Sequence, residues 1–180
     1  MPKKSNNFKK IKRCRLCNSQ KIKKIYNFGS IPIGNDLQKN QFQSINSQKY
    51  PLSLYKCSAC DHFQLSISIN PKILYAKNYT YLTGVTQTFK KHFSHYSNWS
   101  INQCGLKKKS LVLDIGSNDG TCLSYFKKNG MKVIGIDPAK KPSKIANNKG
   151  IKKINNFFNK KISFAIKKKY GQFDFITSHN

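Results

Sequence analysis

The sequence predicts an α/β protein in which a small cysteine-bearing part precedes an open parallel sheet. Two observations support this fold class. From residue 111 onward, short apolar runs alternate with helix-like stretches of about ten residues, which is the pattern of strand–helix–strand units. Before residue 70, short alternating segments broken by turn residues contain two Cys-x-x-Cys pairs. A change of character near Pro71 separates the two patterns.

The first part reads as short strands and loops. KIKKIYNFG, YPLSLYKC and HFQLSISI have the alternation of half-buried strands, and the polar stretch at 38–49 is expected to be a structureless loop. Apolar and aromatic residues after Pro71 approach helical spacing at Phe89, Phe93, Tyr96 and Ile101. The expected organisation is a disordered basic tail at 1–10, a cysteine-bearing domain at 11–70, a helical and aromatic connecting region at 71–108 and a strand–helix domain at 109–180.

The strand–helix domain is read from its apolar runs and its glycines. Gly130, Gly150 and Gly171 stand just past the ends of three helical stretches, where helices commonly end. An open sheet of this type usually has more than four strands, so we expect the domain to be incomplete at its C-terminal end. The predicted strands are 111–115, 132–137, 152–155 and 173–177, and the predicted helices are 120–129, 142–149 and 160–170.

The charge of the chain is strongly positive. It has 34 Lys and Arg residues against six acids, all of them Asp, for a net charge of +28. Such a field attracts nucleic acids and anionic membranes. Lys, Asn and Ile are abundant together, as in AT-rich coding sequences, and the lysines are spread over both halves, so we favour compositional bias and expect no specific nucleic-acid partner.

No segment has the character of a membrane span or a signal peptide. No apolar run reaches the roughly 18 residues of a spanning helix, and the basic N-terminus lacks an apolar core segment. We therefore expect a cytoplasmic, reducing setting and no membrane partner.

The two Cys-x-x-Cys pairs predict a metal site. Cys14 and Cys17 form one pair, and Cys57 and Cys60 form the other after a long insert. Tetrahedral zinc takes four thiolates, and two tight turns can each supply two. Four thiolates leave no position for water, so the expected site is structural, and the domain at 11–70 is a zinc-binding domain.

Other readings of the cysteines remain open. The reducing compartment disfavours disulfides, and a redox pair would not explain why there are two pairs. His62 could replace a ligand, although an ordinary surface or core histidine is favoured. Cys104 and Cys122 read as small hydrophobic residues.

A glycine-containing turn, DIGSNDG, follows the first strand of the second part. Gly116 and Gly120 lie in it, and Asp137 follows 21 positions after Gly116 at the end of the next apolar strand. From there a carboxylate can accept hydrogen bonds from both hydroxyls of a ribose. This arrangement is typical of Rossmann-like sheets and allows either NAD or S-adenosylmethionine.

The charge of the residues in this turn distinguishes between these two cofactors. A pyrophosphate needs bare amides and three glycines, but this turn has two glycines and carries Asp119. A carboxylate there suits a ligand with a sulfonium and an ammonium group. Asp114, Asp119 and Asp137 place half of the acids at this one site, which favours S-adenosylmethionine. The alternatives are that Asp119 only caps a helix and that Asp137 only ends a strand.

The motifs resemble those of a known family. CRLC, PIGND, CSACDHFQLS, NYTYLTG, LDIGSNDGTCL, VIGIDPAKK, KGIKKINNFF and FDFITSHN are similar, in this order, to the N-terminal part of zinc-binding sugar C-methyltransferases. The likeness runs over nearly all of residues 12–180. It implies a zinc-binding domain followed by a Rossmann-like class I methyltransferase sheet, which we expect to be incomplete in this chain.

The resemblance also implies roles for individual residues. Gly116, Ser117, Asn118 and Gly120 would form the cofactor loop, and Asp137 would contact the ribose. Tyr79 and Tyr81 would face the cofactor or substrate, with plain core aromatics as the alternative. His179 would lie at the mouth of the active site as a candidate catalytic residue.

The implied reaction is methylation of carbon on a nucleotide-linked keto-deoxysugar. A base removes a proton next to the keto group, and the enolate carbon attacks the sulfonium methyl. We expect the main base to lie in a second half that this chain lacks, and its own turnover to be absent or weak. The competing hypotheses are a basic zinc-ribbon module that binds nucleic acid and a methyltransferase with a non-sugar small-molecule substrate.

Overall fold

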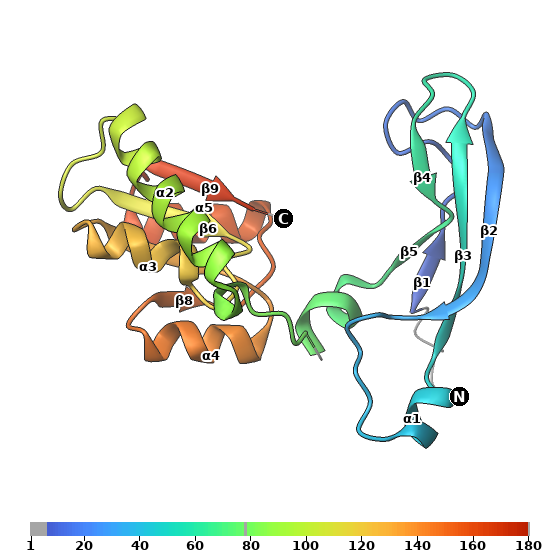
Figure 1. Cartoon of the computed structure of the whole chain (residues 1–180). Helices are drawn as coiled ribbons and strands as arrows, with labels where there is room; N and C mark the ends of the chain where they lie inside the picture. The colour runs from blue at the N-terminus through green and yellow to red at the C-terminus, as the bar shows by residue number, and fades with distance from the viewer. Residues whose placement is uncertain (1–6, 78, 180) are drawn as a thin grey trace. The chain divides into compact units, whose positions relative to one another are not determined.

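The computed structural model describes residues 7–77 and 79–179. The chain divides into two compact units, 1–78 and 79–180 (Figure 1). The boundary falls inside the region expected to connect two domains, at 71–108. The helical turn Lys72–Lys77 of that region belongs to the first unit, and its long helix Gln87–Gln103 belongs to the second. Each unit is described by itself.

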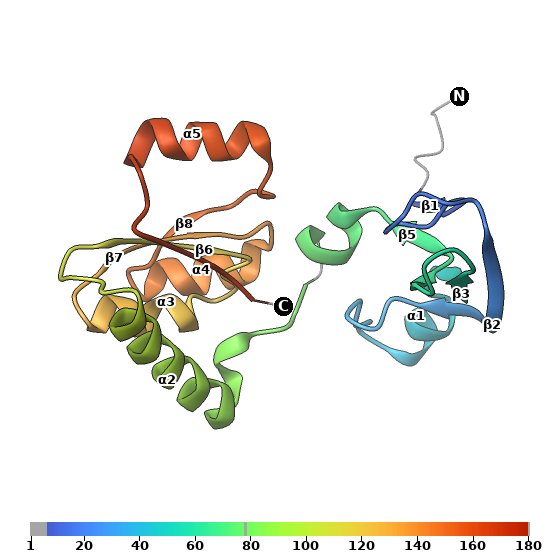
Figure 2. The same ribbon diagram turned by 90° about the horizontal axis from the view of Figure 1, so that it is seen from above.

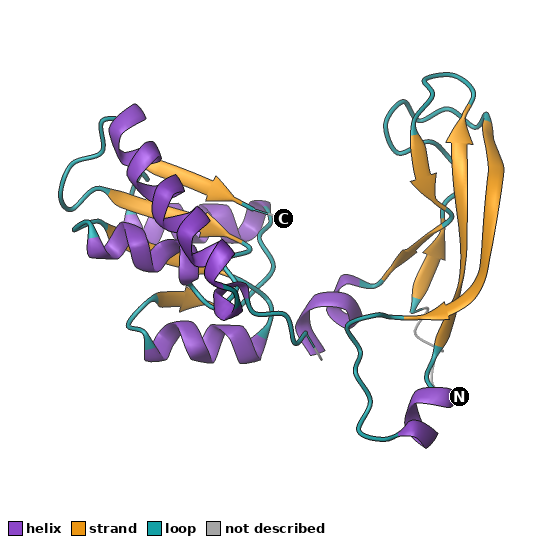
Figure 3. Cartoon of the chain, viewed as in Figure 1, coloured by secondary structure: helices purple, strands orange, loops and turns teal. Residues whose placement is uncertain are grey.

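The first unit is built from antiparallel strands (Figure 3). One sheet has the order β2-β3-β4, and a separate ladder pairs β1 with β5. Few side chains are buried, because β2 is exposed along almost its whole length. The strands are β1 (Phe8–Lys10), β2 (Ile22–Pro32), β3 (Lys49–Cys57), β4 (Phe63–Leu65) and β5 (Ile67–Ile69), with a short helix α1 (Gln41–Ile45) and a π-helical turn η1 (Lys72–Lys77).

Two expectations for this unit were wrong. The expected disordered tail forms strand β1 at Phe8–Lys10, because these residues pair with β5 from the far end of the unit; residues 1–6 of that tail lie outside the described residues. The expected structureless loop contains α1, whose first turn is capped by the Asn40 side chain accepting a hydrogen bond from the Gln43 backbone. Position 49 already belongs to β3.

The second unit is a parallel sheet covered on both faces. Its strand order is β8-β7-β6-β9. Helices α2, α3 and α4 lie on one face and α5 on the other (Figure 2). The strands are β6 (Leu111–Ile115), β7 (Lys132–Ile136), β8 (Lys152–Ile154) and β9 (Phe175–Ser178); the helices are a 3₁₀ turn η2 (Thr83–Val85), α2 (Gln87–Gln103), α3 (Thr121–Lys128), α4 (Lys140–Asn148) and α5 (Lys160–Tyr170).

Each face of this sheet has its own apolar core. Phe93 and Phe126 pack with Val112 and Leu123 on one side, and Ile166 of α5 packs with strand residues on the other. Apolar runs covered on both faces are what a parallel sheet requires. The predicted α/β class is therefore confirmed.

The element limits follow the prediction with small shifts. The predicted first strand and the last helix agree with β6 and α5 at both ends. Helix α4 starts two residues early, so that Pro142 lies in its first turn, where proline is tolerated. Strand β9 starts late, because Asp174 holds the Leu111 backbone N–H through its carboxylate, 2.7 Å away. Cys122 is buried as expected, but Cys104 is exposed at the end of α2.

Candidate functional site

Each cysteine pair lies in a tight turn of the same design. The backbone N–H of Asn18 donates to the Cys14 carbonyl, and that of Asp61 donates to the Cys57 carbonyl, both at 3.0 Å. Asn18 and Asp61 both have positive φ, a conformation that Asn and Asp tolerate better than other non-glycine residues. A bond from the Ser58 N–H to the carbonyl of residue 21 ties the second turn to the start of β2. The fold therefore holds the two turns against each other.

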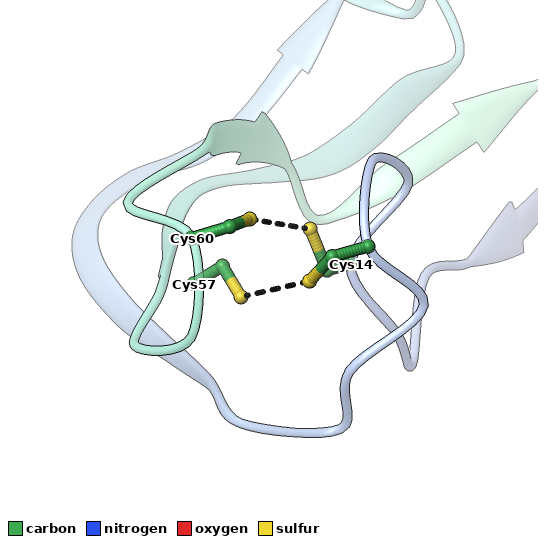
Figure 4. Close-up of side chains that lie close together, drawn as sticks. Cys14, Cys57 and Cys60 are labelled. Atoms are coloured by element: carbon green, nitrogen blue, oxygen red, sulfur yellow. Dashed lines mark hydrogen bonds between the residues drawn. The ribbon is translucent and has the colours of Figure 1, made fainter.

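The four thiols converge on one point. Their sulfur atoms all lie within 4.8 Å of one another. The Sγ atoms of Cys14 and Cys60 lie 3.6 Å apart, and those of Cys17 and Cys57 lie 3.7 Å apart; Figure 4 shows how Cys14, Cys57 and Cys60 point toward one another. A tetrahedral zinc ion with Zn–S bonds of about 2.3 Å places its sulfurs about 3.8 Å apart. The residues therefore fit zinc, and His62 is not among the four ligands; its backbone carbonyl accepts a hydrogen bond from the Cys57 N–H.

The protonation of the cluster also fits a dication. The backbone N–H of Cys17 lowers the pKa of the Cys14 thiol to about 6. At Cys60 the backbone N–H of His62 lowers the pKa, but the neighbouring thiols and burial outweigh it and raise the pKa to about 12. Four adjacent thiols therefore do not all ionise by themselves. A zinc ion removes this conflict, because its charge stabilises all four thiolates.

The second site is the loop between β6 and α3. Gly116, Asn118 and Gly120 all have positive φ, so the chain turns sharply there. The Gly116 and Ser117 backbone N–H groups both donate to the Ile136 carbonyl at the end of β7. A side chain at Gly120 would press within 3.2 Å of Ala146 and Ile151. The predicted glycine turn is thus present, at the carboxyl edge of the parallel sheet.

The carboxylates of Asp137 and Asp119 both accept hydrogen bonds from residues in or next to this loop. The Asp137 carboxylate accepts from the Asn118 N–H at 2.9 Å and from the Ala139 N–H at 2.8 Å. The Asp119 carboxylate accepts from the backbone N–H and the hydroxyl of Thr121, the first residue of α3. Burial alone would raise the pKa of Asp119, but these bonds and an ion pair with Lys149 lower it. The N-cap position of α3 is Gly120, so Asp119 binds the start of this helix from the residue before the cap.

Two lysines balance the three aspartates, and the sequence reading did not single them out. Lys149 pairs with Asp119 at 3.2 Å. The Lys153 ammonium donates to the Ser117 hydroxyl and, at 3.0 Å, to the Asn118 carbonyl. Burial lowers the pKa of Lys153 to about 8, while the nearby aspartates oppose the shift. Lys149 directly follows α4 and Lys153 lies in β8, and nothing in the sequence distinguishes them from the other lysines.

Asp114 is a buried acid of the site. It is the fourth residue of β6 and is 3% exposed, and none of the described residues gives its Oδ1 atom a hydrogen bond. Burial raises the pKa of this carboxyl to about 7, against the attraction of Lys153. An unsatisfied buried acceptor beside a glycine loop is the feature expected where a cationic ligand group binds.

The tyrosine stretch reaches the same loop. The Asn118 side chain donates to the Tyr81 carbonyl and accepts from the Thr83 N–H, both at 3.1 Å. The rings of Tyr79 and Tyr81 meet edge to face with centroids 6.4 Å apart. Tyr81 is 43% exposed, so it is not an ordinary core aromatic.

His179 follows β9 and meets the loop from the other side. Its carbonyl oxygen would lie 3.8 Å from a Cβ at Gly116. Its Nε2 atom lies 2.9 Å from the Thr177 hydroxyl, which in turn bonds Tyr96 at 2.8 Å. Burial, followed by His92, lowers the pKa of His179, so the ring is neutral near pH 7. The loop and His179 occupy the point where the strand order reverses, the usual ligand position in such sheets.

Comparison with known proteins matches both parts of the chain. A family model described as "Putative zinc binding domain" matches residues 14–75, and one described as "Methyltransferase domain" matches residues 90–180. The C-methyltransferase NovU of Streptomyces niveus is 27% identical over 161 residues. The aligned region covers 89% of this chain and 38% of that relative.

These matches identify the two cofactors. A methyltransferase domain uses S-adenosylmethionine, and the four-cysteine cluster within the zinc-binding match is a structural zinc site. In the part of the chain that the structure describes, every helix is too short or too polar to cross a bilayer.

Proposed function

Because the chain belongs to the zinc-binding sugar C-methyltransferase family, we propose that it is the N-terminal portion of an enzyme that methylates carbon using S-adenosylmethionine. The proposed acceptor is the enolate carbon of a nucleotide-linked keto-deoxysugar. The chain aligns with 38% of its relative, so activity and substrate belong to the proposal.

The observation that carries the proposal is the loop at the edge of the parallel sheet with its buried, unsatisfied carboxyl. When bound, S-adenosylmethionine supplies an electrophilic methyl group. Asp114 offers Oδ1 to a cationic donor of the ligand, and the backbone of Gly116–Gly120 shapes the cradle. Asp137 stands at the end of β7, where a carboxylate can bind ribose hydroxyls. Ser117, Asn118 and Asp119 complete the proposed cofactor site.

The substrate side is proposed to include Tyr79, Tyr81 and His179. Neutral His179 has the protonation state that accepts a proton, and Thr177 fixes the orientation of its ring. The main enolising base is proposed to come from outside this chain. Turnover by the 180 residues alone is then absent or weak.

The partner proposal follows from the same sites. A small molecule is expected to bind at the sheet edge, and neither a specific nucleic acid nor a membrane is expected as a partner. Nucleic-acid binding driven by a net charge of +28 would lack sequence preference and would disappear with salt. A cytoplasmic location fits the six free cysteines, since thiolates that bind zinc persist in a reducing compartment.

Calorimetry with S-adenosylhomocysteine tests the cofactor site. We expect one molecule to bind per chain, and D137N to weaken binding roughly tenfold or more, because hydrogen bonds to a charged group are lost. The matched variant D36N changes an aspartate in the other unit and should bind as the wild type does. Absence of binding to the wild type at millimolar ligand would refute the cofactor proposal.

A further inference from the structure

Residues 79–85 form a segment that lies against the cofactor loop; we call it the clasp segment. Two hydrogen bonds join its backbone to the side chain of Asn118. The Nδ2 group donates to the Tyr81 carbonyl, and Oδ1 accepts from the Thr83 N–H, each at 3.1 Å. One side chain of the loop thus binds the segment as a neighbouring strand would.

A third bond and a close fit extend this contact. The Gly84 N–H donates to the Asp119 carboxylate at 3.1 Å. A Cβ added at Gly84 would lie 2.4 Å from the Thr121 hydroxyl and 2.6 Å from Asp119 Oδ2. No side chain fits between the clasp segment and the loop at this point, so position 84 requires glycine for space.

The Asn118 side chain is committed to this contact. It is 7% exposed, and its Oδ1 atom also accepts the Asp119 N–H at 2.8 Å. Its backbone serves the loop instead, since its N–H donates to Asp137 and its carbonyl accepts from Lys153. Asn118 therefore links three parts of the second unit: the clasp segment, the carboxylate after β7 and the lysine of β8.

We propose that Asn118 is a positioning residue that locks the clasp segment, with Tyr79 and Tyr81, onto the cofactor loop. Cofactor binding and the order of the clasp segment then stabilise each other, because coupling between two sites acts equally in both directions. This coupling rests on the proposed cofactor site, whereas the lock itself is a property of the free protein. Its role in methylation is to set the positions of the two tyrosines, not to touch the reacting atoms.

Hydrogen exchange of the free, zinc-loaded chain tests the lock. N118G removes the side chain without backbone strain, because glycine readily adopts the φ of +46° found there. We expect the Thr83 N–H to exchange at least about tenfold faster than in the wild type. N18G, which replaces the asparagine with φ of +60° in the zinc unit, is the matched control and should leave Thr83 unchanged. Equal protection of Thr83 in N118G and wild type would overturn the lock.

A second variant keeps the test independent of changes in the loop. G84A introduces the colliding methyl group and should release the Thr83 and Gly84 amides, whereas G34A, with nothing within 4 Å, should not. If both amides of the clasp segment stay protected in G84A, the proposed close fit is wrong.

Binding of S-adenosylhomocysteine tests the coupling. In the wild type, bound S-adenosylhomocysteine should slow hydrogen exchange of the Thr83 and Gly84 amides. In N118G the affinity for this ligand should fall by the same factor as the one by which the ligand slows that exchange in the wild type. If the ligand binds but leaves the clasp amides unchanged, the coupling is refuted and the cofactor proposal stands. A further outcome is that the wild type binds no ligand while the Thr83 N–H still exchanges faster in N118G than in the wild type. That result would refute the cofactor proposal and the coupling but would support the lock.

Discussion

Among its described apolar side chains, the zinc-binding unit buries only Cys14, Tyr50, Cys57 and Ile67, whereas the cofactor-binding unit has an apolar core on each face of its sheet. Two of those four buried residues are zinc ligands. The eleven residues of β2 are exposed almost throughout, so this strand adds little burial to the first unit. Small domains with so little core generally need a metal or a disulfide to fold.

The contrast indicates two sources of stability in one chain. In the first unit the metal joins two turns of a unit that has little apolar core, so removing one ligand affects the whole unit. In the second unit the stability comes from many apolar contacts, so a single substitution lowers the free energy of unfolding without preventing folding. Three experiments test this contrast.

The largest expected effect comes from removing a zinc ligand. C57S should abolish stoichiometric zinc binding and unfold the first unit, because three thiolates do not close the site and the remaining core is small. Zinc content by atomic absorption and amide exchange over residues 8–69 measure the two effects. C104S changes an exposed cysteine outside the cluster and should behave as the wild type. Retention of one zinc per chain by C57S would show that the four-thiolate assignment is wrong.

A truncation in the apolar core of the second unit should lower the stability of that unit and leave zinc binding unchanged. F126A removes a fully buried ring that packs against Tyr96 and Phe175, and should lower the stability of the second unit by about 3–5 kcal/mol. The single tryptophan, Trp99 of α2, reports this unit by fluorescence during urea unfolding. F164A removes a ring that is 63% exposed and should change stability by about 0.5 kcal/mol or less. Zinc loss in F126A would mean that the units are not independent.

The third expected effect is a difference between the two units in the response of stability to pH. The pKa of Asp114 is raised from 3.8 to about 7, so between these values the unfolded chain releases a proton that the folded chain keeps. This term lowers the stability of the second unit as pH rises from 4 to 7 and is constant above 7. Each unit of pKa difference corresponds to about 1.4 kcal/mol. The zinc unit should respond in the opposite direction, because acid protonates its thiolates and releases the metal.

Urea unfolding of wild type and D114N between pH 4.5 and 8, followed by Trp99, isolates the Asp114 term. The advantage of D114N over the wild type should grow up to pH 7 and then stay constant, while zinc content rises with pH in both. Parallel stability curves for the two proteins would contradict a raised pKa at Asp114.

The sequence was sufficient where the signal is local or strictly spaced. The apolar runs of β6 and β7 and the helical pattern of α5 are set by neighbouring residues, so their positions were predicted closely. The four cysteines were identified by their spacing, and the structure brings them together. The glycine turn and Asp137 were found because a loop between strand and helix demands particular residues.

What the sequence could not give depends on contacts between distant segments. Strand β1 exists because it pairs with β5, nearly sixty residues away, and nothing in Phe8–Lys10 signals this. Lys149 and Lys153 are two of 34 basic residues, and their role appears only when the fold brings them to the aspartates. The contact of Asn118 with the clasp segment was invisible for the same reason.

The order of the parallel sheet has a practical consequence for handling the protein. Among the described strands, β9 pairs only with β6, so one side of its backbone is open, and Ile176 is 56% exposed. An open edge of this type is a template for edge-to-edge aggregation. The net charge of +28 opposes that association through repulsion between copies, and salt weakens the repulsion because the screening length falls to about 10 Å at 0.1 M. Solubility of this chain is therefore expected to fall as ionic strength rises.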